Sequence, residues 1–141
     1  MPREYVPVEL KRRVIERAEE TCEYCLSQAK FALDSLVFEH IVPVSRGGET
    51  IAKFSALACQ GCNNYKYIKR EGLDPISAQF APLYHPREML WSEHFAWSED
   101  TTLIVGLTPT GRATIVALRM NREGVVNLRR VLRITGQHPP R

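Results

Sequence analysis

The sequence predicts an α+β protein whose first half is a small core held together by four cysteines. Three observations support this fold class. Two Cys-x-x-Cys pairs frame the segment 22–62, short β-rich runs lie between them, and helical patterns stand near both ends of the chain. We expect the second half to be a β-rich extension that ends in a helix.

The composition fits one domain, or one core with an extension. The 141 residues are 44% hydrophobic and 25% charged, which excludes a disordered chain, a collagen-like repeat and a coiled coil. No apolar run approaches the roughly 20 residues needed to cross a bilayer. Residues 1–5 show no secretory signal, so we expect a cytoplasmic protein without a membrane partner.

The first elements follow from local pattern. Residues 8–20 predict a helix, because apolar residues recur every four positions among charged neighbours. Residues 36–42 are rich in β-branched and aromatic side chains and are followed by Pro43, so they predict a strand that ends there. The glycine pair at 47–48 indicates a loop, and residues 55–58 predict a second strand.

The chain is expected to divide after the next helix. That helix is predicted over 63–71, with Gly72 at its end. Residues 74–90 contain three prolines and predict an extended linker at the surface. We therefore expect an N-terminal unit at 1–72 and an extension at 73–141, packed together as one unit.

The extension is expected to be a hairpin or meander followed by a helix. Turn residues are present at Asp100 and at 108–111, and residues 121–135 predict the terminal helix. His85 and His138 stand beside prolines, and we expect both at the surface. Three short apolar runs predict antiparallel strands: 94–97, 103–107 and 113–118.

Charge is unevenly distributed along the chain. Residues 71–110 carry 1 basic and 6 acidic side chains, whereas residues 111–141 carry 7 basic and 1 acidic. All seven tail cations are arginines, whose planar forks suit phosphate groups, so the tail could lie along DNA. A solvated helix face is the simpler interpretation of the tail. The acidic middle allows a protein-interaction domain as a further hypothesis.

The cysteines predict a metal site. Cys22-x-x-Cys25 and Cys59-x-x-Cys62 are separated by 33 residues, and two such pairs offer four thiolates to one tetrahedral zinc ion. Disulfides are disfavoured because nothing suggests export. A single pair could be a redox motif, but two pairs without a thioredoxin-like pattern favour structural zinc over redox chemistry or inert thiols.

Three polar residues stand beside this predicted zinc site. Taken singly, Glu39 is a surface carboxylate, His40 is a packed histidine at a strand end, and Asn63 is a helix N-cap. Taken together they are more informative, because the zinc would fix the helix that starts near Asn63 relative to the strand that ends near His40.

The combined pattern resembles the HNH endonuclease family, which has a ββα-metal fold. The resemblance covers about residues 20–70, and residues 85–140 are similar to an extension found in some zinc-containing members. The matching features are Cys22-x-x-Cys25, Glu39-His40-Ile41-Val42-Pro43, Gly47-Gly48, Ala56-Leu57-Ala58-Cys59-x-x-Cys62-Asn63 and Lys66.

The resemblance implies a metal-dependent DNA endonuclease. His40 would be the general base that activates water for attack on a phosphodiester, a role that suits imidazole chemistry. Glu39 and Asn63 would hold one Mg²⁺ or Mn²⁺ ion. An ideal strand points Glu39 and His40 to opposite faces, so a shared site requires a twist or break near Pro43.

One position departs from the family pattern. Phe54 stands where the family has its middle Asn, which pins the loop and helps to orient the catalytic His. Ser55 and Asn64 are the nearby polar residues that could substitute. The departure leaves open a second hypothesis, a zinc-stabilised DNA-binding module that is weakened or inactive in catalysis.

Basic residues around the core fit a phosphate-binding surface. With no base-reading motif, contacts to DNA would be dominated by phosphates and weakly specific. A solubilising face is an equally good interpretation of each residue taken alone. The residues are Arg46, Lys53, Lys66, Lys69 and Arg70.

Overall fold

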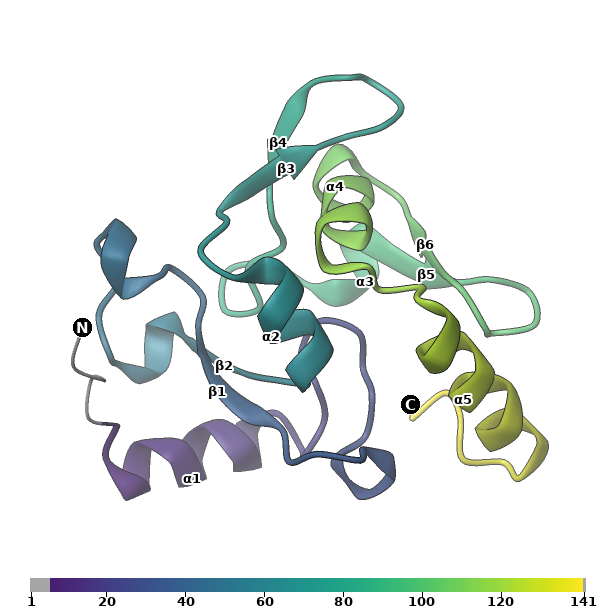
Figure 1. Cartoon of the computed structure of the whole chain (residues 1–141), viewed down its shortest axis with the longest axis horizontal. Helices are drawn as coiled ribbons and strands as arrows, with labels where there is room; N and C mark the ends of the chain where they lie inside the picture. Colours follow the sequence, from purple (N-terminus) through teal and green to yellow (C-terminus); the bar gives the residue numbers. More distant parts are fainter. Residues whose placement is uncertain (1–5, 141) are drawn as a thin grey trace.

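The computed structural model describes residues 6–140, so the N-terminal residues used to look for a secretory signal, and Arg141, lie outside it. Within this range the fold is α+β, as predicted, with three two-stranded antiparallel sheets (Figure 1). No helix between residues 6 and 140 is long and apolar enough to span a membrane.

The strands are β1 (Val37–His40), β2 (Ser55–Ala58), β3 (Glu71–Leu73), β4 (Phe80–Pro82), β5 (Phe95–Trp97) and β6 (Ile104–Gly106). The helices are α1 (Val8–Arg17), α2 (Gln60–Lys66), α3 (Trp91–His94), α4 (Pro109–Leu118) and α5 (Glu123–Ile134).

Helix α1 covers one face of the β1–β2 hairpin. The helix ends at Arg17, three residues earlier than predicted, where Glu19 and Glu20 both take a left-handed φ of 54°. The predicted apolar stripe is confirmed as the contact surface. Its members and their partners on the hairpin form one small cluster: Leu10, Val14, Ala18, Leu36, Phe38 and Leu57.

Helix α2 follows β2 directly and contacts β1. It begins three residues earlier than predicted, because the Cys59 sulfur accepts a hydrogen bond from the Cys62 amide at 3.4 Å and caps the first turn. It ends at Lys66, and Tyr67 then takes a φ of 49° that turns the chain away from the helix axis. The prediction that Gly72 ends this helix is therefore wrong, because Gly72 lies within β3.

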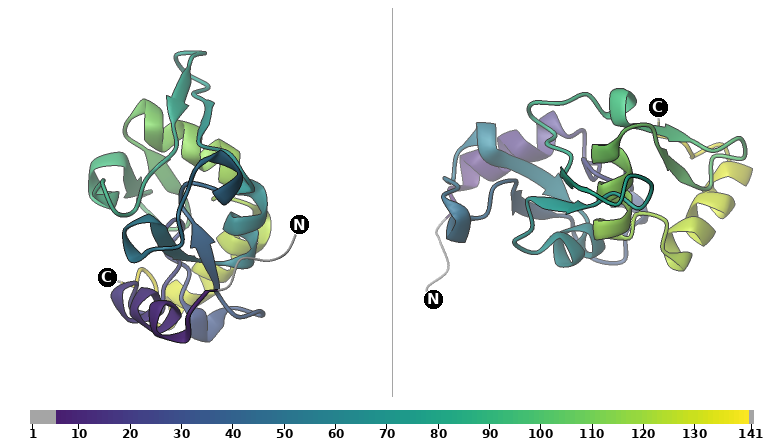
Figure 2. Two further views of the ribbon diagram at one scale, coloured as in Figure 1. Left: turned by 90° about the vertical axis from the view of Figure 1, so that its left-hand side faces the viewer. Right: turned by 90° about the horizontal axis from the view of Figure 1, so that it is seen from above.

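The predicted linker at 74–90 is partly a strand. Its residues 80–82 form β4, which pairs with β3 in a hairpin. The three prolines in this segment favoured a linker over a strand in the sequence. Gly72 and Ala81 are opposite each other in this pair, and α4 packs against both strands. The hairpin projects from the body of the molecule (Figures 1 and 2).

The third predicted strand of the extension is wrong, because residues 113–118 belong to α4. The Thr108 hydroxyl accepts a hydrogen bond from the Gly111 amide at 3.0 Å, and Pro109 occupies the first turn. The residues predicted to form a turn thus start a helix instead. The β5–β6 hairpin and the terminal helix α5 are present close to their predicted positions.

One buried cluster joins the cysteine segment to the extension. His138, predicted at the surface, is buried, with its Nε2 atom 2.7 Å from the Thr101 carbonyl and its ring edge-on to Trp97. The cluster contains all four cysteines and these residues of the extension: Leu83, Tyr84, Phe95, Ile104, Leu118 and Met120.

Candidate active site and metal centre

The four cysteines meet at one buried point between the two parts of the chain. Cys22 and Cys25 lie on the turn after α1, Cys59 follows β2, and Cys62 is in the first turn of α2. All four thiols are free and buried, and their sulfurs lie within 4.8 Å of one another. Four sulfurs this close can hold one metal ion such as zinc.

Arg122 contacts the cysteine cluster from the extension. Its Nη2 atom donates to the Cys59 sulfur at 3.4 Å, and a side chain at Gly61 would overlap its guanidinium group. Burial by itself would lower the pKa of Arg122, but the charges of Cys62, Cys59 and nearby Cys25 raise it above its ordinary value. The arginine therefore compensates the negative charge of the thiolates.

Glu39 is buried on the side of β1 that faces α2. One carboxylate oxygen lies 2.6 Å from the Lys66 ammonium, and the other accepts a hydrogen bond from the Tyr24 hydroxyl at 2.8 Å. Glu39 is 3% exposed and Lys66 is 1% exposed. Burial, followed by the charge of Glu39, raises the pKa of Tyr24, so the phenol stays protonated and can donate. Both oxygens of Glu39 are thus engaged inside the protein.

His40 is half-buried at the end of β1 and has a different set of neighbours. Its Nε2 atom lies 3.0 Å from the Thr50 hydroxyl, and its ring is edge-on to Phe38. The strand register is regular, with His40 opposite Ser55, so the strand neither breaks nor twists enough to turn Glu39 and His40 to one face. His40 lines a cleft on the α1 side, together with Phe38 and Lys11.

Asn63 lies in the first turn of α2 and is half-buried. Its main-chain N–H donates to the Cys59 carbonyl at 3.0 Å, in the usual pattern of an α-helix. Asn63 and Lys66 are three residues apart on one helix and therefore share a face. Because Lys66 binds Glu39, this face of α2 is the one that approaches Glu39.

The loop before β2 is pinned without the family's middle asparagine. The Phe54 carbonyl accepts from the Ile41 amide at 2.8 Å, and the Ser55 hydroxyl donates to the Ile51 carbonyl at 2.6 Å. Arg17 donates to the Ser55 carbonyl at 2.7 Å. Ser55 thus pins the loop, whereas Asn64 is exposed and Thr50 provides the hydroxyl beside the histidine.

Four of the five cations predicted to form a basic surface are exposed, and one is buried. Lys66 differs from the others because it is buried, and its ammonium also donates to the Ile41 carbonyl at 2.8 Å. Four cations are exposed: Arg46, Lys53, Lys69 and Arg70. Arg46 lies 3.5 Å from Glu71, a weak surface pair.

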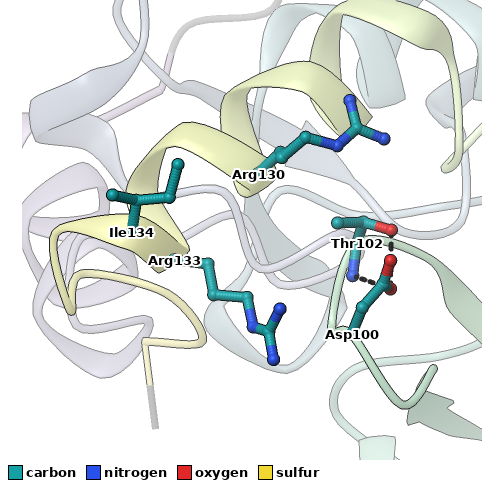
Figure 3. A pocket seen from close by; sticks show the side chains of 5 residues that line it. All are labelled: Asp100, Thr102, Arg130, Arg133 and Ile134. Atoms are coloured by element: carbon teal, nitrogen blue, oxygen red, sulfur yellow. Dashed lines mark hydrogen bonds between the residues drawn. The ribbon is translucent and has the colours of Figure 1, made fainter.

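Most of the tail arginines bind other parts of the protein. Arg112 forms two hydrogen bonds to Asp74, Arg119 stacks on Tyr65, and Arg129 is buried and donates to two main-chain carbonyls. Arg129 is therefore not available to lie along DNA, whereas the exposed Arg119 is. Arg130 and Arg133 are exposed on α5, beside the loop that contains Asp100 and Thr102 (Figure 3).

Tyr24, Thr50 and Arg122 were not identified from the sequence. Each acts on a residue at least ten positions away, so no short motif includes them. The one available signal is that Tyr24 lies inside the first cysteine pair, where a buried aromatic residue must satisfy its hydroxyl.

Comparison with known proteins identifies the segment that contains the cysteines and the Glu39–His40 pair. Residues 22–74 match the model of a family described as HNH endonuclease. The match begins at the first cysteine and includes the whole β1–β2–α2 unit. A search of curated proteins found no match to the chain.

Proposed function

From the match of residues 22–74 to the HNH endonuclease family, we propose that this protein is a DNA endonuclease that hydrolyses phosphodiester bonds. The observation that carries the proposal is this match, which includes the helix and hairpin that hold His40, Glu39 and Asn63. In this proposal His40 is the general base, and DNA is bound chiefly through its phosphates.

The metal at the cysteine cluster is proposed to be zinc with a structural role. Four thiolates favour zinc, and a site that offers four protein ligands leaves no open position for substrate. Sulfurs bound to zinc at about 2.3 Å are roughly 3.8 Å apart in a tetrahedron. The 3.7 Å between the Cys25 and Cys59 sulfurs is compatible with that geometry.

His40 is proposed to take a proton from the attacking water. A half-buried imidazole at a strand end is accessible to a phosphate yet restrained in orientation. The Thr50 hydroxyl at 3.0 Å and the edge-on contact with Phe38 both restrain the ring. Thr50 therefore supplies the orientation that Phe54 cannot.

Glu39 and Asn63 are proposed to hold a divalent cation, Mg²⁺ or Mn²⁺. Carboxylate and amide oxygens are ligands that these ions prefer, and the ion would stabilise charge on the phosphate and on the leaving oxygen. Because Lys66 already lies 2.6 Å from Glu39, an ion can bind this carboxylate only if Lys66 gives up that contact. Lys66 is thus a competitor for the site. Because Glu39 and His40 lie on opposite faces of β1, the ion and the base can act on one phosphate only if the end of this strand turns when DNA binds.

The test is plasmid cleavage with Mg²⁺ or Mn²⁺. We expect nicking or cutting by the unaltered protein and loss of activity in His40→Ala. Asn63→Ala should also lose activity, whereas Asn64→Ala, a change of the exposed neighbour, should not. Zinc content and thermal unfolding of each variant show whether it is folded. Cleavage that is absent, or unchanged in folded His40→Ala, would contradict the proposal.

A second candidate function is a DNA-binding module without catalysis. Phe54 and the engagement of both Glu39 oxygens favour it, because the first removes a family side chain and the second occupies a proposed metal ligand. This candidate predicts retention of DNA on a gel without nicking under each divalent ion. Phe54→Asn would then gain activity. A protein without salt-dependent DNA binding would point instead to a protein-interaction domain.

A further inference from the structure

The β3–β4 hairpin presents an uncharged apolar tip to solvent. Ile76 is 75% exposed, Phe80 is 74% exposed and Leu73 is 48% exposed. Leu73 and Phe80 are opposite each other in the strand register and so share the outer face of the hairpin. Residues 75–84 contain no Asp, Glu, Lys or Arg. The tip therefore combines exposed apolar side chains with uncharged polar ones, on a hairpin that projects from the rest of the chain (Figure 2).

A buried ion pair holds this turn in place. Asp74 is fully buried and accepts two hydrogen bonds from Arg112 of α4, at 2.8 and 3.0 Å. It also accepts from the amides of Ile76 and Ser77 at 3.1 and 3.2 Å. The turn is thus tied both to itself and to α4, while the side chains of Ile76 and Phe80 are left in water.

The inner face of the hairpin explains why the outer face is free. Ala81 is 6% exposed, and a side chain at Gly72 would press on Leu83 and on the main chain of α4. These small residues let the hairpin pack closely against α4 on one side. The apolar residues on the other side contribute nothing to this packing, so they are free to contact a partner outside the chain.

The surroundings of the hairpin favour DNA as that partner. Lys69 and Arg70 are exposed immediately before β3, and the four residues 67–70 connect the hairpin to α2, which carries Asn63. Cations at the base of a hairpin can neutralise phosphates while an apolar tip reaches the bases. Proteins that unstack and bend DNA combine basic residues with apolar wedges such as Phe, Leu and Ile in this way.

We propose that the β3–β4 hairpin is a DNA wedge, which inserts Phe80 and Ile76 between stacked bases while Lys69 and Arg70 bind the adjacent phosphates. The inference rests on the proposed function, since it assigns a role in binding the same substrate. It adds a DNA contact that is separate from the proposed catalytic residues. This contact lies on the hairpin that follows α2 in the chain. The wedge unstacks bases beside the site of cleavage.

The test uses the His40→Ala protein and a short duplex containing 2-aminopurine, whose fluorescence rises when the base is unstacked. We expect the fluorescence to rise on binding. In a Phe80→Ser/Ile76→Ser double variant the rise should disappear and affinity should fall by roughly tenfold. Ile134→Ser, which changes an 81% exposed residue on α5, is the matched control and should behave like the parent. Lys69→Gln/Arg70→Gln should weaken binding and lower its salt dependence, yet keep the fluorescence rise at saturation.

The outcomes separate the wedge from the proposed function. DNA binding without any fluorescence change, or with equal affinity in the double variant, would overturn the wedge alone. No DNA binding by the unaltered protein would overturn both. A double variant that binds DNA normally but loses self-association in size-exclusion chromatography would show that the tip docks a second copy, and would also overturn the wedge.

Discussion

Lys66 in the cysteine-containing part and Arg129 in the extension are both buried cations, but they are satisfied differently. In the cysteine-containing part, Glu39 and Lys66 form one buried pair whose charges cancel. In the extension, Arg129 is 4% exposed and has no carboxylate partner among residues 6–140. It donates to the carbonyls of Thr102 and Met120 and stacks on Trp97. An arginine-rich stretch of sequence therefore does not always form a basic surface, because an arginine such as Arg129 can be buried and donate to main-chain oxygens.

The largest effect is expected from the cysteines, which both parts depend on. Cys59→Ser should abolish metal binding and cooperative unfolding, because structural zinc supplies about 10–16 kcal/mol in small zinc domains and Cys59 also accepts from Arg122. Elemental analysis and circular dichroism measure both effects. Ser45→Ala, at an exposed position, is the control and should keep about one zinc per chain. Native-like unfolding of Cys59→Ser without metal would contradict this prediction, because the fold would then not depend on the metal.

The next largest effect, on stability, should come from breaking the buried ion pair between Lys66 and Glu39. Lys66→Met should lower the free energy of unfolding by about 3–5 kcal/mol, because it leaves the Glu39 charge buried without its partner. Urea denaturation measures the change. Lys66→Met/Glu39→Leu removes both charges and should recover much of the loss. A single variant as stable as the parent would mean that water reaches Glu39.

Arg129 should be less costly to replace than Lys66. Arg129→Met removes donors from two carbonyls and leaves no buried charge behind, so we expect a loss of about 1–3 kcal/mol in the free energy of unfolding. Arg130→Met, at an exposed neighbouring position, is the control in the same urea experiment and should change little. A loss as large as that of Lys66→Met would remove the distinction between the two cations.

The smallest effect concerns pH. Burial, and to a lesser degree the charge of Arg129, lower the pKa of His138 in the folded protein. The unfolded chain therefore binds this proton more readily, so protonation favours unfolding. Stability should be fully retained above the ordinary histidine pKa of about 6.5 and should fall as the pH drops below it. His138→Gln should flatten this slope in thermal unfolding, whereas Gln137→Ala should not. An unchanged slope in His138→Gln would assign it to other groups.

Local pattern was enough to predict the core of the fold. The second strand begins and ends where its apolar run does, at Ser55 and Ala58, and the two cysteine pairs meet as their spacing indicated. The segment at 113–118 was mistaken for a strand because its β-branched residues fit either structure. The cap at Thr108 and the proline after it decided in favour of a helix.

The site was harder to predict because its partners are distant in the chain. Lys66 was expected on the surface as a helical cation, but Glu39, 27 positions earlier, draws it inside. Arg122 was counted with the tail, yet it contacts Cys59, 63 positions earlier. Periodicity describes contacts within an element and contains no information about such pairs. The roles of His40, Glu39 and Asn63 in catalysis stay predictions.

The contact between Arg122 and Cys59 also has a consequence for synthesis on the ribosome. Arg122 is 60 positions after Cys62, the last thiol. At about 5–20 residues per second, the arginine is made roughly 3–12 s after the thiol set is complete. Any metal that the thiols bind during this interval is bound without help from Arg122. The order of the sequence lets the sulfur cluster form first and gives the later-made extension a finished surface on which to fold.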